Sequence, residues 1–220
     1  MPRHSNKLQK WISKSEQEKI ESLITSLERR YPFEVVVAFS DSPAIVPMAA
    51  ARMIACLAVI ADLIAETFWL PIPAGVFGLV VLFFLFAPAG HWQGLLPFRI
   101  LSRRSERRDS IEVQAELCFS ELGLARTKER NALLLFFNLH ERIFTIRPDR
   151  TLQNEWPQLN IEELVTELKT NLEKTKAPST AAAQSIERLL TLAQARWPDH
   201  SEKHLTENEL PNAVCWWMPR

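Results

Sequence analysis

The sequence predicts an α/β fold in which a small central mixed β-sheet packs with helices and is interrupted by a two-helix transmembrane hairpin. Three observations indicate this fold. The apolar runs LLLFFNL and IFTI follow each other across a short charged link, as two neighbouring strands do. A further strand-like run, EVVVAF, stands much earlier in the chain and is too short to form a sheet alone. Between these parts, no charged residue occurs from Thr67 to Gly90.

Composition sets the limits of the prediction. The chain has 220 residues, enough for one globular domain and a further element. Its 26 basic and 26 acidic side chains cancel, so bulk charge does not predict nucleic-acid binding. The N-terminus lacks the apolar core of a secretory signal peptide. The cysteines Cys56, Cys118 and Cys215 are far apart, without CxxC spacing, and fit a reducing environment.

Residues 1–42 are predicted to form the first part of the domain. Within them, residues 15–30 have the spacing of an amphipathic helix, and Ser15 and Glu18 have the spacing of a capping box. The valine-rich run at 34–39 favours a strand, which Ser42-Pro43 stops. This strand needs partners, and they must come from the chain beyond the apolar middle.

Residues 43–90 are predicted to be the transmembrane hairpin, with spans at about 44–66 and 71–89. A helical span needs roughly 20 mostly apolar residues, and the second span meets that length without a charge. Trp69 and Trp92 flank it, as aromatic residues do at a membrane interface. The alternative is a helix buried in a protein core.

The first span carries an intramembrane polar face of Arg52, Asp62 and Glu66. One interpretation is a path for protons or ions, because charged residues inside a membrane are costly. The other is a polar stripe that faces the second helix or another subunit. The second span offers no charged partner, which favours the stripe.

Residues 91–104 are predicted to be a basic juxtamembrane linker. Positive charge beside both spans places the termini and the soluble domain in the cytoplasm, with the protein multi-pass in the cell's inner membrane. Lipid headgroups fit a basic cluster in this position better than nucleic acid does. The arginines predicted to contact the membrane surface are Arg99, Arg103, Arg104, Arg107 and Arg108.

Residues 105–214 are predicted to complete the domain, and residues 215–220 to form a tail. A helix from about 105 to 122 ends at Gly123, and two strands and two more helices, at 161–176 and 185–198, follow. The charged link between the strands, His140 to Arg142, is either an exposed turn or a catalytic trio, and the turn is the simpler geometry. The two tryptophans of the tail suit an apolar surface.

This order of elements resembles the TPM domain family, which spans bacterial membrane proteins and a plant thylakoid-lumen protein linked to photosystem II repair. The resemblance covers roughly residues 10–42 and 105–214. It is carried by the run RTKERNALLLF, the strand that ends at Asp149, Trp156, and the closing Leu210-Pro211-Asn212. It implies a compact α/β domain with a membrane insertion after the first strand.

Family resemblance also implies acid phosphatase activity and calcium binding. All five glycines lie between Gly75 and Gly123, so no glycine-rich loop is present to bind phosphate. Asp41 follows the first strand and Asp149 follows the last strand of the predicted hairpin. This pair is the candidate metal site, for Ca²⁺ or Mg²⁺, and no other cofactor is predicted.

The leading functional hypothesis is a membrane-anchored domain that binds or helps to assemble or maintain membrane proteins. No catalytic set is recognisable in the sequence. The expected partners are the lipid bilayer and either a membrane protein or a second copy of the chain, without nucleic acid. The alternative is a divalent-metal-dependent phosphomonoester hydrolase that uses the two aspartates.

Overall fold

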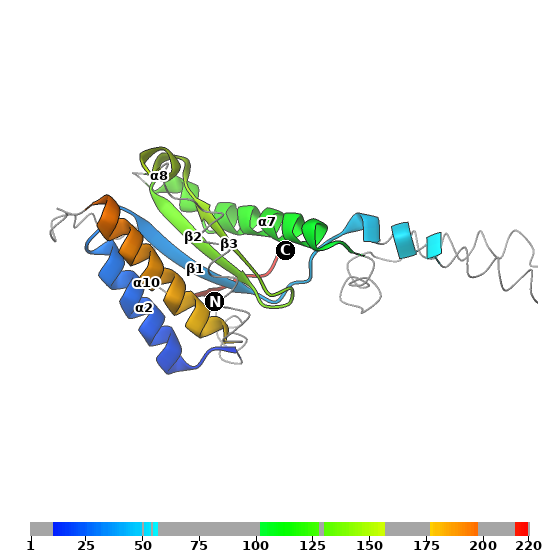
Figure 1. Ribbon diagram of the computed structural model, residues 1–220, viewed down its shortest axis with the longest axis horizontal. Helices are drawn as coiled ribbons and strands as arrows, with labels where there is room; N and C mark the ends of the chain where they lie inside the picture. Colours follow the sequence, from blue (N-terminus) through cyan, green and yellow to red (C-terminus); the bar gives the residue numbers. More distant parts are fainter. Residues whose placement is uncertain are drawn as a thin grey trace, which may run out of the picture. The chain divides into compact units, whose positions relative to one another are not determined.

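The computed structural model describes residues 11–49, 51–53, 55–56, 102–127, 130–156, 177–197 and 214–219 (Figure 1). The chain divides into two compact units. The first consists of Met1–Ser42 together with Ile111–Arg220, and the second is Pro43–Ser110. The first unit holds the β-sheet.

The sheet has four strands in the order β3-β2-β1-β4. β1 (Glu34–Ser40) pairs in parallel with β2 (Ala132–Asn138). β3 (Ile143–Pro148) is antiparallel to β2, and β4 (Cys215–Trp216) is parallel to β1. The mixed sheet, the β2–β3 hairpin and the pairing of the first strand with much later ones are therefore confirmed.

Both faces of the sheet are buried under helices. α2 (Lys14–Glu28) and α10 (Pro178–Arg196) lie side by side against one face, and α7 (Arg104–Glu121) lies on the other (Figure 1). Val35 and Val37 belong to the core under α2 and α10, while the alternate residue Val36 is equally buried on the opposite face. A strand that is covered on both faces is apolar throughout rather than alternating, which explains the unbroken runs EVVVAF and ALLLFF.

Two helix starts differ from their prediction. The capping box of α2 is formed by Ser13 and Glu16, two residues before the predicted pair. α10 begins at Pro178 and includes the alanine-rich segment that the sequence analysis assigned to a linker. Proline suits the first turn of a helix and alanine is the best helix former, so this segment extends the helix.

The ends of two other elements are set by single residues. Gly123 ends α7 in the left-handed conformation, with φ of 72°, before the short 3-10 helix η1 (Leu124–Arg126). This confirms the predicted stop, because glycine adopts that conformation without steric cost. α8 (Arg150–Glu155) follows β3 and was not predicted. The helix predicted at 161–176 lies outside the described residues.

The transmembrane hairpin in the predicted fold class is wrong, and the fold class is corrected to mixed α/β. Among the described residues, no helix combines the length and the apolar composition that a membrane crossing needs. Of the first predicted span, residues 47–49, 51–53 and 55–56 are helical, and residues 57–66 lie outside the described residues. The second span, 71–89, lies outside the described residues.

The predicted localisation depended on that hairpin. An integral protein of the bacterial inner membrane, with both termini and the soluble domain in the cytoplasm, is therefore withdrawn together with the spans. The guanidinium of Arg52, predicted to belong to an intramembrane polar face, instead binds Glu106 through two hydrogen bonds of 2.6 and 2.9 Å. A charge-assisted pair of this kind satisfies the arginine within the protein.

Candidate functional site at the carboxyl ends of the parallel strands

The carboxyl ends of β1 and β2 meet at one edge of the sheet, because the two strands are parallel. Ser40 at the end of β1 is opposite Asn138 at the end of β2. Polar residues follow each strand at this edge: Asp41 and Ser42 after β1, and the hairpin turn after β2. Ligands of open α/β sheets commonly bind at such an edge, so it is the first place to look for a functional site.

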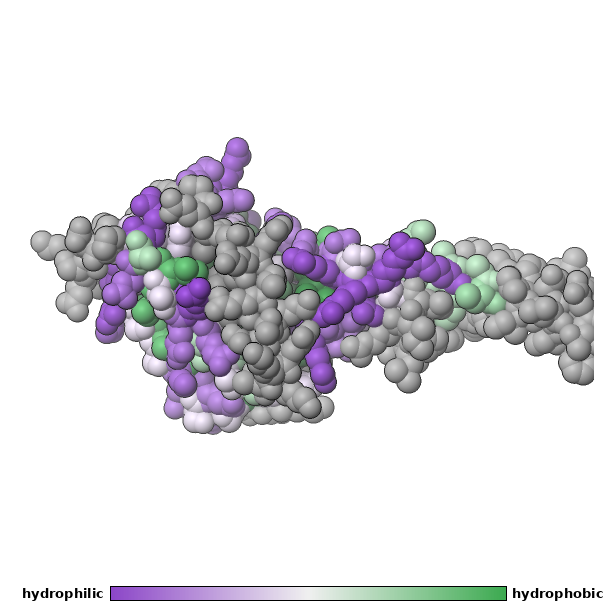
Figure 2. Space-filling view, viewed as in Figure 1, coloured by the Kyte–Doolittle hydropathy of each residue, from purple (hydrophilic) through white to green (hydrophobic). Residues whose placement is uncertain are grey.

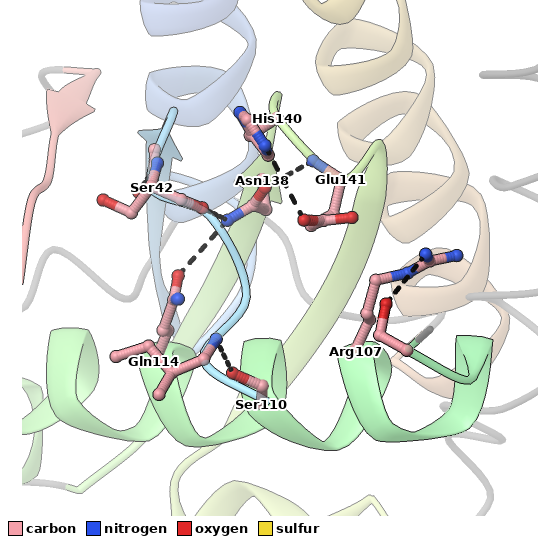
Figure 3. Close-up of polar contacts among 10 residues, drawn as sticks. Ser42, Arg107, Ser110, Gln114, Asn138, His140 and Glu141 are labelled. Carbon is pink, nitrogen blue, oxygen red and sulfur yellow. Dashed lines mark hydrogen bonds and ion pairs between the residues drawn. The ribbon is translucent and has the colours of Figure 1, made fainter. Parts of the chain in front are cut away.

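Asn138 connects three segments at this edge (Figure 3). Its Nδ2 donates to the carbonyl oxygen of Ser42 at 2.8 Å and to Gln114 Oε1 of α7 at 3.2 Å. Its Oδ1 accepts the N–H of Glu141 in the hairpin turn at 2.8 Å. Asn138 and Gln114 are almost completely buried. Both amide hydrogens and the amide oxygen of Asn138 are thus used inside the protein.

Ser40 makes a second set of contacts at the same edge. Its carbonyl oxygen accepts the N–H of Leu139 at 2.7 Å, and its Oγ accepts the N–H of Ser42 at 3.2 Å. The Ser40 side chain is completely buried. The loop after β1 and the turn after β2 are therefore tied to each other by buried hydrogen bonds, which fixes their shape.

The turn between β2 and β3 contains the charged trio of the sequence analysis. Residues 139–142 form a turn, as predicted, and Arg142 adopts a left-handed φ of 54°. His140 Nε2 lies 3.8 Å from Glu141 Oε1. The side chain of His140 is 35% exposed, whereas that of Glu141 is 4% exposed and not solvated as expected.

The two aspartates of the predicted metal site are not brought together. Asp41 follows β1 at the edge described above, whereas Asp149 follows β3. Because β3 runs antiparallel to β2, Pro148 is opposite Leu133, at the other end of the strands. Six residues of strand separate the two edges, which is roughly 20 Å. One divalent ion cannot bind both carboxylates.

Asp149 serves a structural purpose at its own edge. Its Oδ1 accepts the N–H of Arg150 at 2.5 Å at the start of α8, and its N–H donates to the carbonyl oxygen of Ala132 at 2.7 Å. Its Oδ2 is buried without a hydrogen-bond partner. A single carboxylate oxygen does not make a metal site, and the described residues contain no group of three side chains able to hold a metal ion. The residues present do not fit a Ca²⁺ or Mg²⁺ site.

The predicted basic and polar clusters are only partly within the described residues. Arg103 precedes α7, and Arg104, Arg107 and Arg108 lie in its first turns. Arg107 Nη1 donates to Ser102 Oγ at 3.2 Å. Arg99 lies outside the described residues. So do Asp62 and Glu66 of the predicted intramembrane polar face, so the structure does not show that face.

Two thiols are shielded from solvent, because Cys118 is buried and Cys215 is partly buried. Burial raises the pKa of Cys118 well above its usual range, and the nearby Cys215 and Glu121 raise it further. Burial also raises the pKa of the Cys215 thiol. The thiolate is the nucleophilic form of cysteine, so neither residue is equipped for catalysis. Cys56 is exposed, and it lies in the second unit.

The sequence analysis missed most residues of this edge. Ser40, Gln114 and the buried carboxylate of Glu141 were not singled out. One signal was available, because Asn138 is the polar residue within the otherwise apolar run LLLFFNL. A polar side chain in a buried strand needs hydrogen-bond partners, and these could have been expected at the strand's end.

Comparisons with known proteins show the fold but not a function. No protein-family model matches the sequence, and no curated protein matches it. Among solved structures, the chain is similar to the BA42 protein of the psychrophilic bacterium Bizionia argentinensis, which was determined by NMR. The TM-score is 0.52 with 12% sequence identity, over 94% of this chain and 95% of that one. BA42 has the TPM-like fold, and at this identity the likeness concerns the fold alone.

Proposed function

We propose that this chain is a TPM-like domain that acts by binding a protein partner, in the assembly or maintenance of membrane proteins, rather than by catalysis. The likeness to the fold of BA42 supports the TPM-like part of the proposal. The observation that carries the binding part is that Asn138 and Ser40, at the carboxyl edge, direct their hydrogen bonds to other groups of the chain.

Catalysis needs groups that are directed at a substrate. At the carboxyl edge, the amide of Asn138 is bonded to Ser42, Gln114 and Glu141, and each of these contacts is internal. A site built for ligand chemistry keeps donors and acceptors available for the substrate and the transition state. An edge whose buried polar groups bond one another instead holds two loops in a fixed shape, which suits recognition by a partner.

The hydrolase alternative loses its main support. Phosphoryl transfer needs a metal ion or basic groups to neutralise charge, together with an oriented nucleophile. The carboxylates proposed for that metal, Asp41 and Asp149, lie at opposite ends of the sheet. His140 Nε2 lies 3.8 Å from Glu141 Oε1, but within the described residues nothing beside this pair is arranged as a phosphate site.

Two measurements test the proposal. The purified full chain is assayed on p-nitrophenyl phosphate with and without Ca²⁺ or Mg²⁺, beside Asp41→Asn and Asp149→Asn. We expect no metal-dependent turnover in any of the three proteins. Turnover that requires a metal and disappears in Asp149→Asn would establish the hydrolase and refute a purely binding role.

The second measurement is affinity capture from detergent-solubilised membranes of the source cell, with the full chain as bait. We expect one membrane protein to be retained in stoichiometric amount after salt washing. The heat-denatured chain is the matched control, because retention by the unfolded chain would reveal non-specific hydrophobic binding. Failure to retain any protein over this control counts against a binding function.

A further inference from the structure

The outer face of α7 exposes two large apolar side chains, Val113 and Leu117, at 61% and 48% of their surface. They are four residues apart on one helix and therefore neighbours on its surface. Hydrophilic residues predominate on the described surface seen in Figure 2, with small apolar areas between them. Among the described residues, the exposed large apolar side chains are Trp11, Ile45, Met48, Val113 and Leu117.

The same face of α7 is acidic. From Ile111 to Glu121 the helix contains Glu112, Glu116 and Glu121, and it contains no lysine or arginine. Glu116 is 59% exposed and already binds a guanidinium, that of Arg147 on β3, with Arg147 Nε donating to Glu116 Oε2 at 2.8 Å. This exposed apolar pair with its glutamates, residues 112–121, is called the α7 surface below.

The position of Glu121 at the end of α7 is electrostatically unfavourable for the helix. The carboxyl end of a helix carries a partial negative charge, so acidic residues near it are unfavourable and basic ones are favourable. The last turn of α7 holds Glu121 and has no basic residue. Glu121 accepts a hydrogen bond from Trp217 Nε1, which gives it a structural use. Glu116 has no comparable buried partner, because its contact with Arg147 is at the surface.

We propose that the α7 surface docks a basic amphipathic helix of a partner protein, with two apolar side chains one turn apart and lysines or arginines beside them. This inference rests on the proposed binding function and names the surface and the chemistry of the partner. Apolar side chains of the partner cover Val113 and Leu117, while its cations lie against Glu112 and Glu116. Arg147 already contacts Glu116 in this way. Complementary charge of this kind sets partner choice and association rate.

A second copy of the chain is a poor occupant of the same surface. Two α7 surfaces brought together would set glutamates against glutamates, and like charges across an interface suppress association. The apolar pair is also small compared with the ~800 Å² per partner of a standard interface. The docking is therefore weak and transient.

The test uses a defined probe and the full chain. The probe is a synthetic 18-residue helical peptide with two leucines four residues apart, flanked by lysines, and its control carries glutamates in place of the lysines. Binding is followed by NMR through amide shifts of the chain in low salt and in 0.5 M NaCl. We expect saturable shifts centred on residues 112–121 with the basic peptide, weakened at least fivefold by salt, and none with the acidic peptide.

Variants of exposed residues make the assignment specific. Glu116→Lys and Leu117→Ser are each expected to weaken binding at least fivefold, while Glu187→Lys, the same charge change on an exposed position of α10, leaves it unchanged. Circular dichroism verifies that all three variants fold. The inference is overturned if the shifts map elsewhere, if the acidic peptide binds equally, or if Glu187→Lys weakens binding as much as Glu116→Lys.

The outcome can be separated from that of the proposed function. A partner captured by the full chain and still retained by both Glu116→Lys and Leu117→Ser overturns the α7 surface while the binding function stands. Loss of the captured partner in these two variants, and not in Glu187→Lys, supports both.

Discussion

Glu16, in the first turn of α2, accepts a hydrogen bond from the hydroxyl of Ser179, in the first turn of α10, although 163 positions separate them in the chain. The same carboxylate accepts the N–H of Ser13 at 2.8 Å. The two helices lie side by side (Figure 1), and one negative charge therefore stands at two helix N-termini, where the partial charge of each helix is positive. The hydroxyl of Ser179, followed by Ser13, lowers the pKa of Glu16.

We expect Glu16→Ala to destabilise the protein by about 1–2 kcal/mol at pH 7, the usual cost of losing a helix cap. The folded pKa of Glu16 is depressed below its ordinary value of 4.5. Its contribution is therefore fully present above that value and is lost as the pH falls through the folded pKa. Urea unfolding of both proteins at several pH values measures this difference.

The control for this prediction is Glu18→Ala, an exposed glutamate on the same helix. It should change the unfolding free energy by less than about 0.5 kcal/mol at every pH. If the difference in unfolding free energy between Glu16→Ala and the unaltered protein stays the same at acid pH, the charge of the carboxylate is irrelevant to the cap.

Asn138→Ala should destabilise the protein by about 2–3 kcal/mol, because it leaves buried partners without hydrogen bonds. The groups affected are the carbonyl of Ser42, the side chain of Gln114 and the N–H of Glu141. The midpoint of urea unfolding measures the loss. Asn154→Ala, at an exposed position of α8, is the matched control and should shift the midpoint little. Equal shifts for the two variants would contradict the structural role of Asn138.

The sequence pattern was sufficient to predict the elements whose burial is apparent from a short run of neighbouring residues. The run ALLLFF predicts β2 because a strand covered on both faces is apolar at every position. The run EVVVAF predicts β1, and its need for partners beyond the apolar middle follows from its shortness. The stripe Ile20, Ile24 and Leu27 predicts α2, and all three residues are buried.

Features that depend on tertiary contacts could not be predicted in this way. Ser13 and Ser15 both precede a glutamate by three residues, and only contact with α10 selects the pair Ser13 and Glu16. Gln114 becomes a partner of Asn138 only when α7 packs on the sheet. The separation of Asp41 from Asp149, by contrast, could have been predicted from the sequence. A tight β2–β3 hairpin requires antiparallel strands, so the end of β3 lies at the edge of the sheet opposite to the end of β2.

β4 and Trp217, near the end of the chain, also depend on tertiary contacts and could not be predicted from a local pattern. The sequence analysis placed residues 215–220 in a tail that suits an apolar surface. Trp216 instead pairs with Phe39 at the edge of the sheet, and both Trp216 and Trp217 are buried within the domain. A strand of two residues carries no periodic pattern, so its place is determined by pairing with β1.

Trp217→Phe should cost about 1–2 kcal/mol, because it removes the hydrogen bond that Trp217 Nε1 donates to Glu121 Oε2 at 2.8 Å. The contact with the ring of Phe136, at a centroid distance of 5.6 Å, can persist in the variant. A double-mutant cycle with Glu121→Ala, measured by urea unfolding, isolates the hydrogen bond. Effects that simply add in the double variant would show that the two residues are not coupled.

The pair of Arg52 and Glu106 leads to a prediction within the second unit. Two hydrogen bonds from the guanidinium of Arg52, and then the N–H of Arg103, lower the pKa of Glu106 to about 2. In Arg52→Gln the pKa of Glu106 should rise toward its ordinary value of 4.5, and it should stay somewhat below that value because the N–H of Arg103 remains. NMR titration of the side-chain carboxyl group measures the change.

Arg108→Gln is the control for the last prediction, because it removes one positive charge from an exposed position two residues after Glu106. Charge at the surface is screened by salt over about 8–10 Å, whereas a bidentate pair acts through direct hydrogen bonds. Arg108→Gln should therefore leave the titration of Glu106 nearly unchanged in 0.15 M salt. If both variants moved the pKa of Glu106 equally, general positive charge, rather than the contact with Arg52, would be its cause.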